Sequence, residues 1–164
     1  MKIDQLMEFL RYDHESGDLF WKKSTNRRIV VGSKAGTLRG NGRLQVCING
    51  KIYLSSRLAW ALYYKQWPIN EIDHIDGNPL NNAIVNLRDV TRKVNAQNKR
   101  KAHKGNSSGY LGVRRVLGCT KSKKWEAVIS VNGSTRVLGR FTSPEEAYQR
   151  YVEAKRLLHE GCTL

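Results

Sequence analysis

Two neighbouring residues in the segment EIDHIDGNPLNNAIVNL, residues 71–87, could do hydrolytic chemistry. Asp73 offers a carboxylate oxygen to a hard cation, and His74 offers an imidazole that acts as a base near neutral pH. Asn95, further along the chain, offers a neutral amide oxygen. These oxygen donors suit Mg²⁺, which keeps several waters and phosphate oxygens among its ligands. A base that activates water, beside a cation that holds a phosphate, could hydrolyse a phosphodiester.

The same segment also fits an ordinary hairpin. Asp76-Gly77 is common turn chemistry, and an Asp-His pair beside a turn is not unusual. Neighbours on a regular strand point to opposite faces, so Asp73 and His74 can serve one site only if the strand ends or twists there. Residue types alone therefore leave the catalytic and the structural interpretations open.

Charge is the strongest bulk signal in the 164-residue chain. The chain has 29 Lys and Arg residues but only 14 Asp and Glu residues, which gives a formal net charge of +15. No acidic residue lies between Asp18 and Glu71, and none lies between Asp89 and Glu126. Two long acid-free stretches in a chain that can fold favour a nucleic-acid partner over a solvated face or a membrane-surface patch. Charge alone does not separate DNA from RNA, so an RNA-binding protein stays open as a third interpretation.

Other bulk features narrow the class. The three cysteines, Cys47, Cys119 and Cys162, have no paired metal spacing, so we expect neutral thiols and neither a disulfide framework nor a structural zinc site. No apolar run reaches membrane length, and the first residues lack a signal-peptide layout. We therefore expect a soluble, cytoplasmic protein with no membrane partner.

The pattern along the chain predicts an α+β fold. A short helix within residues 1–18 precedes a β-rich part in which Asn49-Gly50 marks a hairpin turn. A helix over residues 56–67 stops at Pro68, and a strand, a loop, a strand and a helix capped by Thr91 follow. After a polar segment, AHKGNSSG, three strands and a helix opened by Ser143-Pro144 complete the chain.

The run DHIDGNPLNN, followed by NLRDVT and a helix bearing Asn, resembles the HNH endonuclease family over residues 57–100. The similarity is to the phage-type group, in which Asn replaces the last His. It implies a ββα-metal hairpin and helix, and an endonuclease that hydrolyses double-stranded DNA. It also implies Asp73 and Asn95 as metal ligands and His74 as general base. Asn86 would clasp the loop and orient His74, and Arg92 would contact the phosphate.

The cofactor implied by this resemblance is Mg²⁺, with Mn²⁺ or another divalent ion as an alternative, and no small-molecule cofactor. The missing final His leaves the identity of the metal open. Asn98 lies one helical turn after Asn95 and is a rival ligand. Asn82 is expected to hold the loop.

Residues 109–161 resemble the plant ethylene-response-factor (APETALA-type) DNA-binding domain. The matching residues include Gly112-Val113-Arg114, Trp125, Leu138-Gly139 and Glu145-Glu146-Ala147. The resemblance implies a three-stranded antiparallel sheet that enters the major groove with one helix behind it. By charge, we expect DNA contacts from five residues: Arg114, Arg115, Lys123, Lys124 and Arg136.

These resemblances predict four parts. They are a β-rich N-terminal region with a supporting helix (1–68), an HNH unit (69–101), a linker (102–108) and an ethylene-response-factor-like domain (109–164). The predicted function is a phage-type HNH homing endonuclease that nicks DNA as a monomer and keeps slow cleavage when residues 105–164 are deleted. The alternative is a DNA-binding regulator with an inactive HNH unit.

Overall fold

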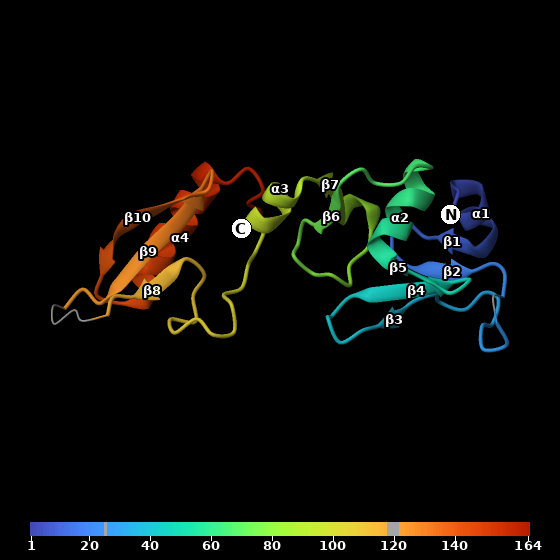
Figure 1. The fold of residues 1–164 in the computed structure, drawn as a ribbon, viewed down its shortest axis with the longest axis horizontal. Helices are drawn as coiled ribbons and strands as arrows, with labels where there is room; N and C mark the ends of the chain where they lie inside the picture. Colours follow the sequence, from blue (N-terminus) through green and yellow to red (C-terminus); the bar gives the residue numbers. More distant parts are fainter. Residues whose placement is uncertain (25, 118–121) are drawn as a thin grey trace. The chain divides into compact units, whose positions relative to one another are not determined.

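The computed structural model describes residues 1–24, 26–117 and 122–164, which form two compact units, Met1–Arg92 and Lys93–Leu164 (Figure 1). The fold is α+β, as the sequence predicts. Among the described residues, no helix combines the length and the apolar character that a membrane span needs. Cys47 and Cys162 are free thiols, and Cys119 lies outside the described residues.

The first unit opens with two small antiparallel sheets and two helices. Their elements are α1 (Ile3–Phe9), β1 (Leu10–Tyr12), β2 (Leu19–Trp21), β3 (Thr37–Leu38), β4 (Leu44–Ile48), β5 (Lys51–Leu54) and α2 (Ser55–Tyr64). The β4–β5 turn is the one that Asn49-Gly50 predicts: both residues have positive φ, 49° and 78°, which matches the twist of the flanking strands. The helix α2 ends where Lys65 takes a left-handed conformation, three residues before Pro68.

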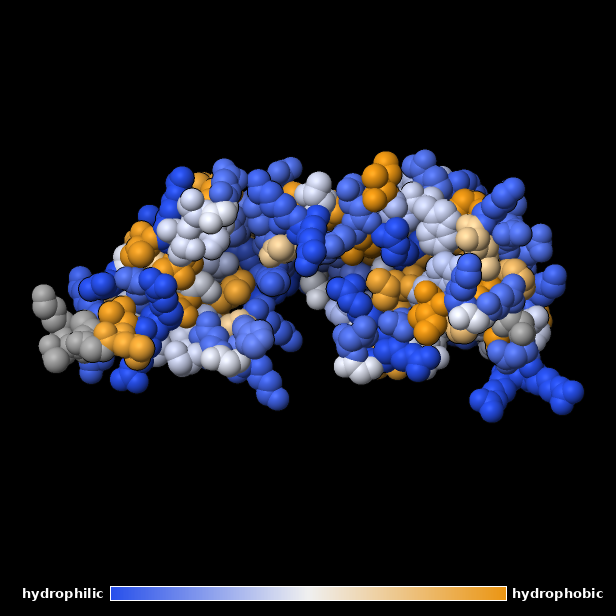
Figure 2. All heavy atoms as spheres, in the orientation of Figure 1, coloured by the Kyte–Doolittle hydropathy of each residue, from blue (hydrophilic) through white to orange (hydrophobic). Residues whose placement is uncertain are grey.

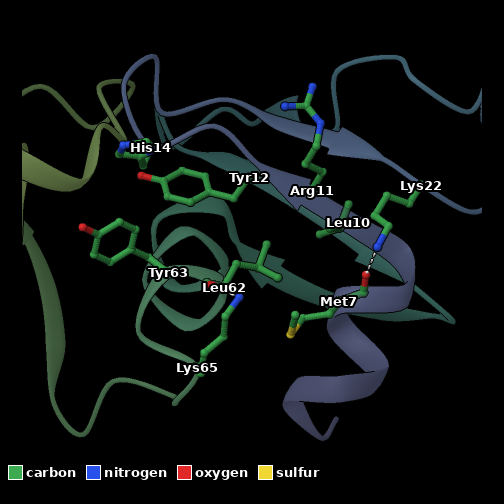
Figure 3. Close-up of a pocket in the computed structure, with 9 residues that line it drawn as sticks. All are labelled: Met7, Leu10, Arg11, Tyr12, His14, Lys22, Leu62, Tyr63 and Lys65. Carbon is green, nitrogen blue, oxygen red and sulfur yellow. Dashed lines mark hydrogen bonds between the residues drawn. The ribbon is translucent and has the colours of Figure 1, made fainter.

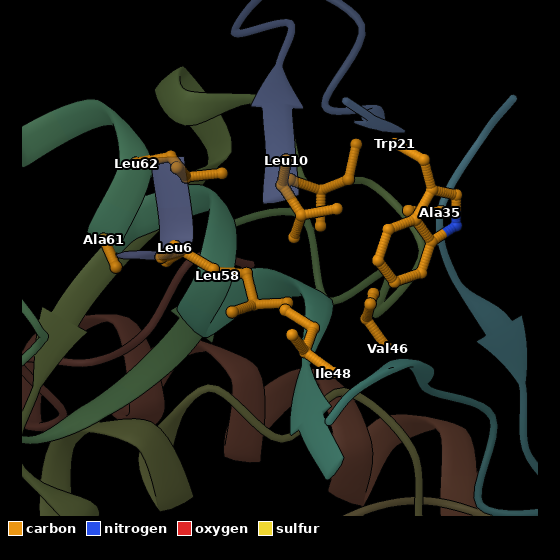
Figure 4. Close-up of a cluster of buried hydrophobic side chains, with 10 residues drawn as sticks. Leu6, Leu10, Trp21, Ala35, Val46, Ile48, Leu58, Ala61 and Leu62 are labelled. Atoms are coloured by element: carbon orange, nitrogen blue, oxygen red, sulfur yellow. The ribbon is translucent and has the colours of Figure 1, made fainter. Parts of the chain in front are cut away.

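One apolar cluster joins these elements (Figure 4). Leu6 of α1, Ile48 of β4 and Leu58 of α2 are fully buried, and Val46 and Leu10 are nearly so. Removing such side chains from water stabilises the unit, because each buried aliphatic side chain contributes about 1.5–3 kcal/mol. The cluster therefore fixes α2 on the small sheets.

A hairpin of β6 (Glu71–His74) and β7 (Leu87–Val90), with the short helical turn η1 (Ile84–Asn86) between them, completes the first unit. Ile72 and Leu87 pack on Ala59 of α2, which seats the hairpin on the helix. The Asp89 carboxylate accepts the backbone N–H groups of Ile69 at 2.7 Å and Asn70 at 2.8 Å. These two hydrogen bonds fix the entry to β6 opposite β7.

The second unit contains α3 (Arg92–Gln97), which begins at the boundary, and a sheet with the strand order β10-β9-β8. Its strands are β8 (Val113–Arg115), β9 (Trp125–Val131) and β10 (Ser134–Phe141), and α4 (Pro144–Leu158) packs on them. Ser143 Oγ accepts the N–H of Glu146 at 3.2 Å, the cap that the sequence predicts. The predicted three antiparallel strands and one helix are confirmed.

Two local features shape the start of this sheet. Gly112 has φ +73°, and a Cβ there would lie 2.0 Å from the Tyr151 ring, so only glycine fits. In the expected linker, Asn106 Nδ2 donates to the carbonyl of Tyr110 at 3.1 Å, and Ser108 Oγ donates to that of Val113 at 2.9 Å. The end of this segment is thus bonded to the start of the sheet. The four-part division itself stays a prediction.

Candidate active site

The hairpin places Asp73 and His74 at the end of β6. The strand ends at His74, whose carbonyl accepts the N–H of Gly77 at 2.8 Å as the loop begins. The register pairs Asp73 with Arg88 and His74 with Leu87, so the two neighbours lie on opposite faces of the hairpin. The strand does end at His74, but the two side chains lie on opposite faces up to that point, so the sharing of one site by Asp73 and His74 stays a prediction.

His74 is buried, and its ring makes a hydrogen bond to the side chain of Asn82. Its Nε2 lies 3.1 Å from Asn82 Oδ1. An amide oxygen only accepts hydrogen bonds, so Nε2 carries the proton and Nδ1 is the basic nitrogen of the neutral ring. Burial lowers the pKa of His74 below its usual 6.5, and the positive charge of Arg43 lowers it further against the opposing effects of Asn82, Asp76 and Asp73. The ring is therefore a neutral base at pH 7.

Asn86 contacts the loop rather than the histidine. Its Oδ1 accepts the N–H of Asp76 at 2.9 Å, and its Nδ2 donates to Asp76 Oδ1 at 3.0 Å and to the Asn81 carbonyl at 2.8 Å. The expected clasp of the loop is thus seen in these contacts. The side chain that hydrogen-bonds the His74 ring is Asn82, and the expectation that Asn86 orients His74 stays a prediction. A catalytic role for Asn86 stays a prediction.

The segment that carries Asn82 is supported from the N-terminal end of the chain. Tyr12 donates its hydroxyl to the Asn82 carbonyl at 2.7 Å, and Ile84 donates its N–H to the His14 carbonyl at 3.1 Å. Gly17 has φ +79°, and a Cβ there would lie 2.3 Å from Ala83 N. Burial raises the pKa of Tyr12, so its hydroxyl stays a donor. The sequence does not indicate the contact between Tyr12 and Asn82, because no local pattern links residues about seventy positions apart.

A cavity of about 360 Å³ lies beside this support (Figure 3). Tyr12 and His14 form part of its wall, and Lys22 Nζ donates to the Met7 carbonyl at 2.8 Å, the dashed line in Figure 3. Neither Asp73 nor His74 lines it. The candidate site is therefore the hairpin end, where the chemistry-bearing side chains lie, and not this cavity.

Asp73 is buried and paired across the hairpin. Its Oδ2 accepts hydrogen bonds from Arg88 Nε at 2.8 Å and Nη2 at 2.7 Å. Among the described residues, no group of three His, Cys, Asp or Glu side chains gathers as a metal site. A carboxylate with an amide such as Asn95 nevertheless offers the hard oxygens that Mg²⁺ takes when water and phosphate complete its shell.

The other predicted HNH residues lie in α3. Arg92 is its exposed first residue, and Asn95 lies in the part that belongs to the second unit. The pairing of Asn95 with Asp73 stays a prediction. Asn98, the rival ligand, is buried, and its Oδ1 accepts a short hydrogen bond from the Thr163 hydroxyl. The choice between Asn95 and Asn98 as the metal ligand stays a prediction.

The predicted DNA-contacting residues divide between the two faces of the C-terminal sheet. Arg114 donates to Glu126 Oε2 through Nε at 2.8 Å, and Arg140 donates to Oε1 at 3.2 Å. Burial raises the pKa of Glu126, but the two arginines outweigh it and lower that pKa overall. Arg115 pairs with Trp125 and so lies on the face opposite to Arg114.

The remaining three of these residues, Lys123, Lys124 and Arg136, are exposed. The two lysines precede β9, and Arg136 lies on β10. Arg140 was not among the expected DNA-contacting residues. The strand register pairs both Arg114 and Arg140 with Glu126, so the two arginines lie on the same face of the sheet. Contact with DNA stays a prediction for all five.

Comparisons with known proteins agree with the hairpin chemistry. Residues 53–97 match the family model described as HNH endonuclease. Protein 3.8 of Escherichia phage T7 is 43% identical over 63 residues, 38% of this chain and 48% of the phage protein. The uncharacterized HNH endonuclease L560 of Acanthamoeba polyphaga mimivirus is 35% identical over 80 residues, 49% of this chain and 38% of the viral protein. No solved structure matches the chain.

These matches give the chain an HNH endonuclease domain with phage and viral relatives. The matched region of the chain spans less than half the length of either relative. The family match ends at residue 97 and leaves out the C-terminal sheet, so the ethylene-response-factor-like resemblance stays a prediction.

The environment of His74 predicts a pH dependence in the metal-free protein. Its folded pKa lies below 6.5, whereas the unfolded chain binds the proton near 6.5. The free energy of unfolding should therefore be constant above that pH and fall as the pH drops from 6.5 toward the folded pKa. Ring-proton NMR titration of His74 measures its pKa in the folded protein, and a midpoint at or above 6.5 would contradict the prediction.

The Arg88–Asp73 pair predicts a loss of stability. Arg88→Met keeps the aliphatic stem and removes the guanidinium from the buried Asp73 carboxylate. The free energy of unfolding should fall by about 1–3 kcal/mol, at the low end if solvent screens the pair, because the Arg88 side chain is 25% exposed. Urea denaturation at pH 7 measures it. The control Lys34→Met breaks an exposed pair with Asp18 and should change stability by less than about 0.5 kcal/mol; equal losses would count against the interpretation.

Proposed function

We propose that the chain is a metal-dependent HNH endonuclease of the homing type, which hydrolyses a phosphodiester of double-stranded DNA and nicks one strand as a monomer. The observation that carries this proposal is the hydrogen bond from His74 Nε2 to Asn82, which fixes the neutral tautomer with Nδ1 as the base. The HNH match over residues 53–97 supplies the class of reaction.

In the proposed reaction, Nδ1 of His74 accepts a proton from the attacking water. Asn82 Oδ1 keeps the ring oriented and stabilises the imidazolium that forms, because it accepts the Nε2–H throughout. The positive charge of Arg43 works in the other direction and favours release of that proton after the bond has broken. One base serves one phosphate, so a monomer cuts one strand in each binding event.

Asp73 and Asn95 would hold a divalent cation, with Mg²⁺ preferred and Mn²⁺ an alternative, because both offer oxygen donors. When bound, the cation stabilises negative charge on the phosphate and on the leaving oxygen. Arg88 shares the Asp73 carboxylate and fixes its position across the hairpin. Arg92, exposed at the start of α3, would contact the phosphate.

The proposed substrate agrees with the charge of the molecule. Hydrophilic side chains cover much of the face shown in Figure 2, and the chain carries a formal charge of +15. Such a surface binds the DNA backbone by releasing counterions. The sheet of the second unit is the proposed anchor on the duplex, with Arg114 on one of its faces and Arg115 and Arg136 on the other.

A second candidate function has one observation in its favour. Arg88 donates a hydrogen bond to Asp73 Oδ2 through Nε and forms an ion pair with the same oxygen through Nη2, so it competes with a cation for that carboxylate. A chain in which Arg88 wins this competition would be a DNA-binding regulator with an inactive HNH unit.

A plasmid assay separates the two functions. Wild-type protein with Mg²⁺ should convert supercoiled plasmid to the nicked circle, and His74→Ala should lower the rate by about 10²–10⁴-fold, the usual contribution of a general base. His103→Ala is the matched control, because His103 lies outside the hairpin and its Nδ1 accepts the backbone N–H of Gly105 at 3.2 Å. It should nick at the wild-type rate.

Two outcomes would contradict the nuclease. Wild-type protein that shifts DNA in a gel but nicks with neither Mg²⁺ nor Mn²⁺ would support the regulator. Nicking that persists in His74→Ala would point to a contaminating nuclease or to a different base. Circular dichroism of each variant shows whether a lost activity reflects lost folding.

The anchoring role of the sheet predicts a change in salt dependence. Arg114→Ala and Arg136→Ala should each weaken binding and reduce the slope of log Kd against log salt concentration by about one, if each arginine neutralises one phosphate. Arg150→Ala is the control, because that arginine lies on α4 and pairs with Glu153 at 3.2 Å. Fluorescence anisotropy over a salt series measures the slopes, and identical slopes in all variants would exclude these two residues from the interface.

A further inference from the structure

The helix α3 is too short and too polar to be stable without contacts from other segments. It has six residues, Arg92–Gln97, and none of them is buried. Isolated helices shorter than about 12–15 residues are marginal in water, because nucleation costs more than so few hydrogen bonds return. Contacts from other parts of the second unit must therefore hold it in place.

The end of the chain supplies these contacts to the last turn of α3. We call residues 159–164 the C-terminal tail. Gly161 donates its N–H to Gln97 Oε1 at 2.9 Å, and the Thr163 hydroxyl donates a short hydrogen bond to Asn98 Oδ1. Arg100 Nη2 donates to Thr163 O at 2.8 Å and to its Oγ1 at 2.6 Å. The tail thus bonds Gln97, Asn98 and Arg100, three polar residues at and just after the end of the helix.

The backbone of the tail also lies directly against α3. A Cβ at Gly161 would lie 2.1 Å from the carbonyl oxygen of Val94, so any larger residue must push the tail off the helix. Lys155 of α4 is 1% exposed and donates a short hydrogen bond to the carbonyl of Lys99. A buried ammonium is stable only where its donors find acceptors, which makes this bond costly to lose.

The sheet holds the first turn of α3 and the start of the tail. Lys93 Nζ donates to Asn132 Oδ1 in the β9–β10 turn at 3.0 Å. The ring of His159 lies 2.9 Å, through Nε2, from the carbonyl of Ser130 on β9. The first turn of α3 therefore contacts the β9–β10 turn, and the segment after its last turn contacts α4.

We infer that the C-terminal tail is a positioning device for α3, the helix that carries Asn95: it holds the end of this helix within the second unit through Gly161 and Thr163. The inference rests on the proposed function for the role of Asn95. A chain ending at residue 104 lacks the tail, so the expectation that it keeps slow cleavage gives way to an expectation of inactivity.

Two substitutions test the device in the full-length chain. Gly161→Ala introduces the clash with Val94, and Thr163→Val removes the hydroxyl at nearly constant volume. Their controls are Gly105→Ala, where the nearest atom lies 3.7 Å from the new Cβ, and Thr142→Val, whose hydroxyl bonds Glu146 at the other end of α4. The measurements are amide hydrogen exchange in residues 93–99 and the Mg²⁺ concentration that gives half-maximal nicking.

Both tail variants should raise the exchange rate of residues 93–99 by about tenfold or more, and should raise the required Mg²⁺ concentration by about 10–100-fold, the usual cost of a lost supporting contact around a metal ligand. The two controls should behave like the wild type in both measurements. Gel shifts in EDTA should be unchanged in all four variants.

Two results would overturn the inference, and a third would overturn the proposed function separately. Wild-type exchange in both tail variants would overturn it. Faster exchange with an unchanged Mg²⁺ requirement would reduce the tail to a purely structural role and also overturn it. If the wild type nicks with no divalent ion, the proposed function fails separately, and hydrogen exchange alone then decides whether the tail holds α3.

Discussion

The hydrogen bond between His74 Nε2 and Asn82 Oδ1 is the contact on which the chemistry of the hairpin depends. It assigns the proton to one ring nitrogen and leaves the other as the base. Asn82 can do this only because its backbone is fixed by Tyr12 and its neighbour Ala83 lies against Gly17. The small N-terminal sheet is thus part of the apparatus that orients a side chain about sixty residues later.

Two demands on charge meet in this molecule. A nucleic-acid partner requires an excess of positive charge, whereas a general base must stay unprotonated. The structure satisfies both demands at His74, because burial and the nearby Arg43 lower its pKa while the basic surface remains available to DNA. In the proposed enzyme, Arg43 would therefore add to the attraction of DNA and also help to keep His74 unprotonated.

Local sequence signals predicted much of the architecture, and contacts between distant residues account for what was missed. Asn49-Gly50 and Ser143-Pro144 act within a few residues, so their hairpin and helix start were predictable. The Arg88–Asp73 pair follows once the β6–β7 register is known, but the register comes from the hairpin and not from composition. Tyr12 with Asn82, and Thr163 with Asn98, join residues that no periodicity relates.

The contacts between the C-terminal tail and α3 bear on how such a chain can evolve. Genes of modular nucleases are expected to exchange their DNA-binding parts by recombination at linkers. Here an exchange at residues 102–108 would replace Gly161 and Thr163 while keeping Gln97 and Asn98, and so would separate each hydrogen bond from its partner. A foreign C-terminal part would therefore have to bring a matching tail, which ties the inheritance of the helix to that of the sequence sixty residues downstream.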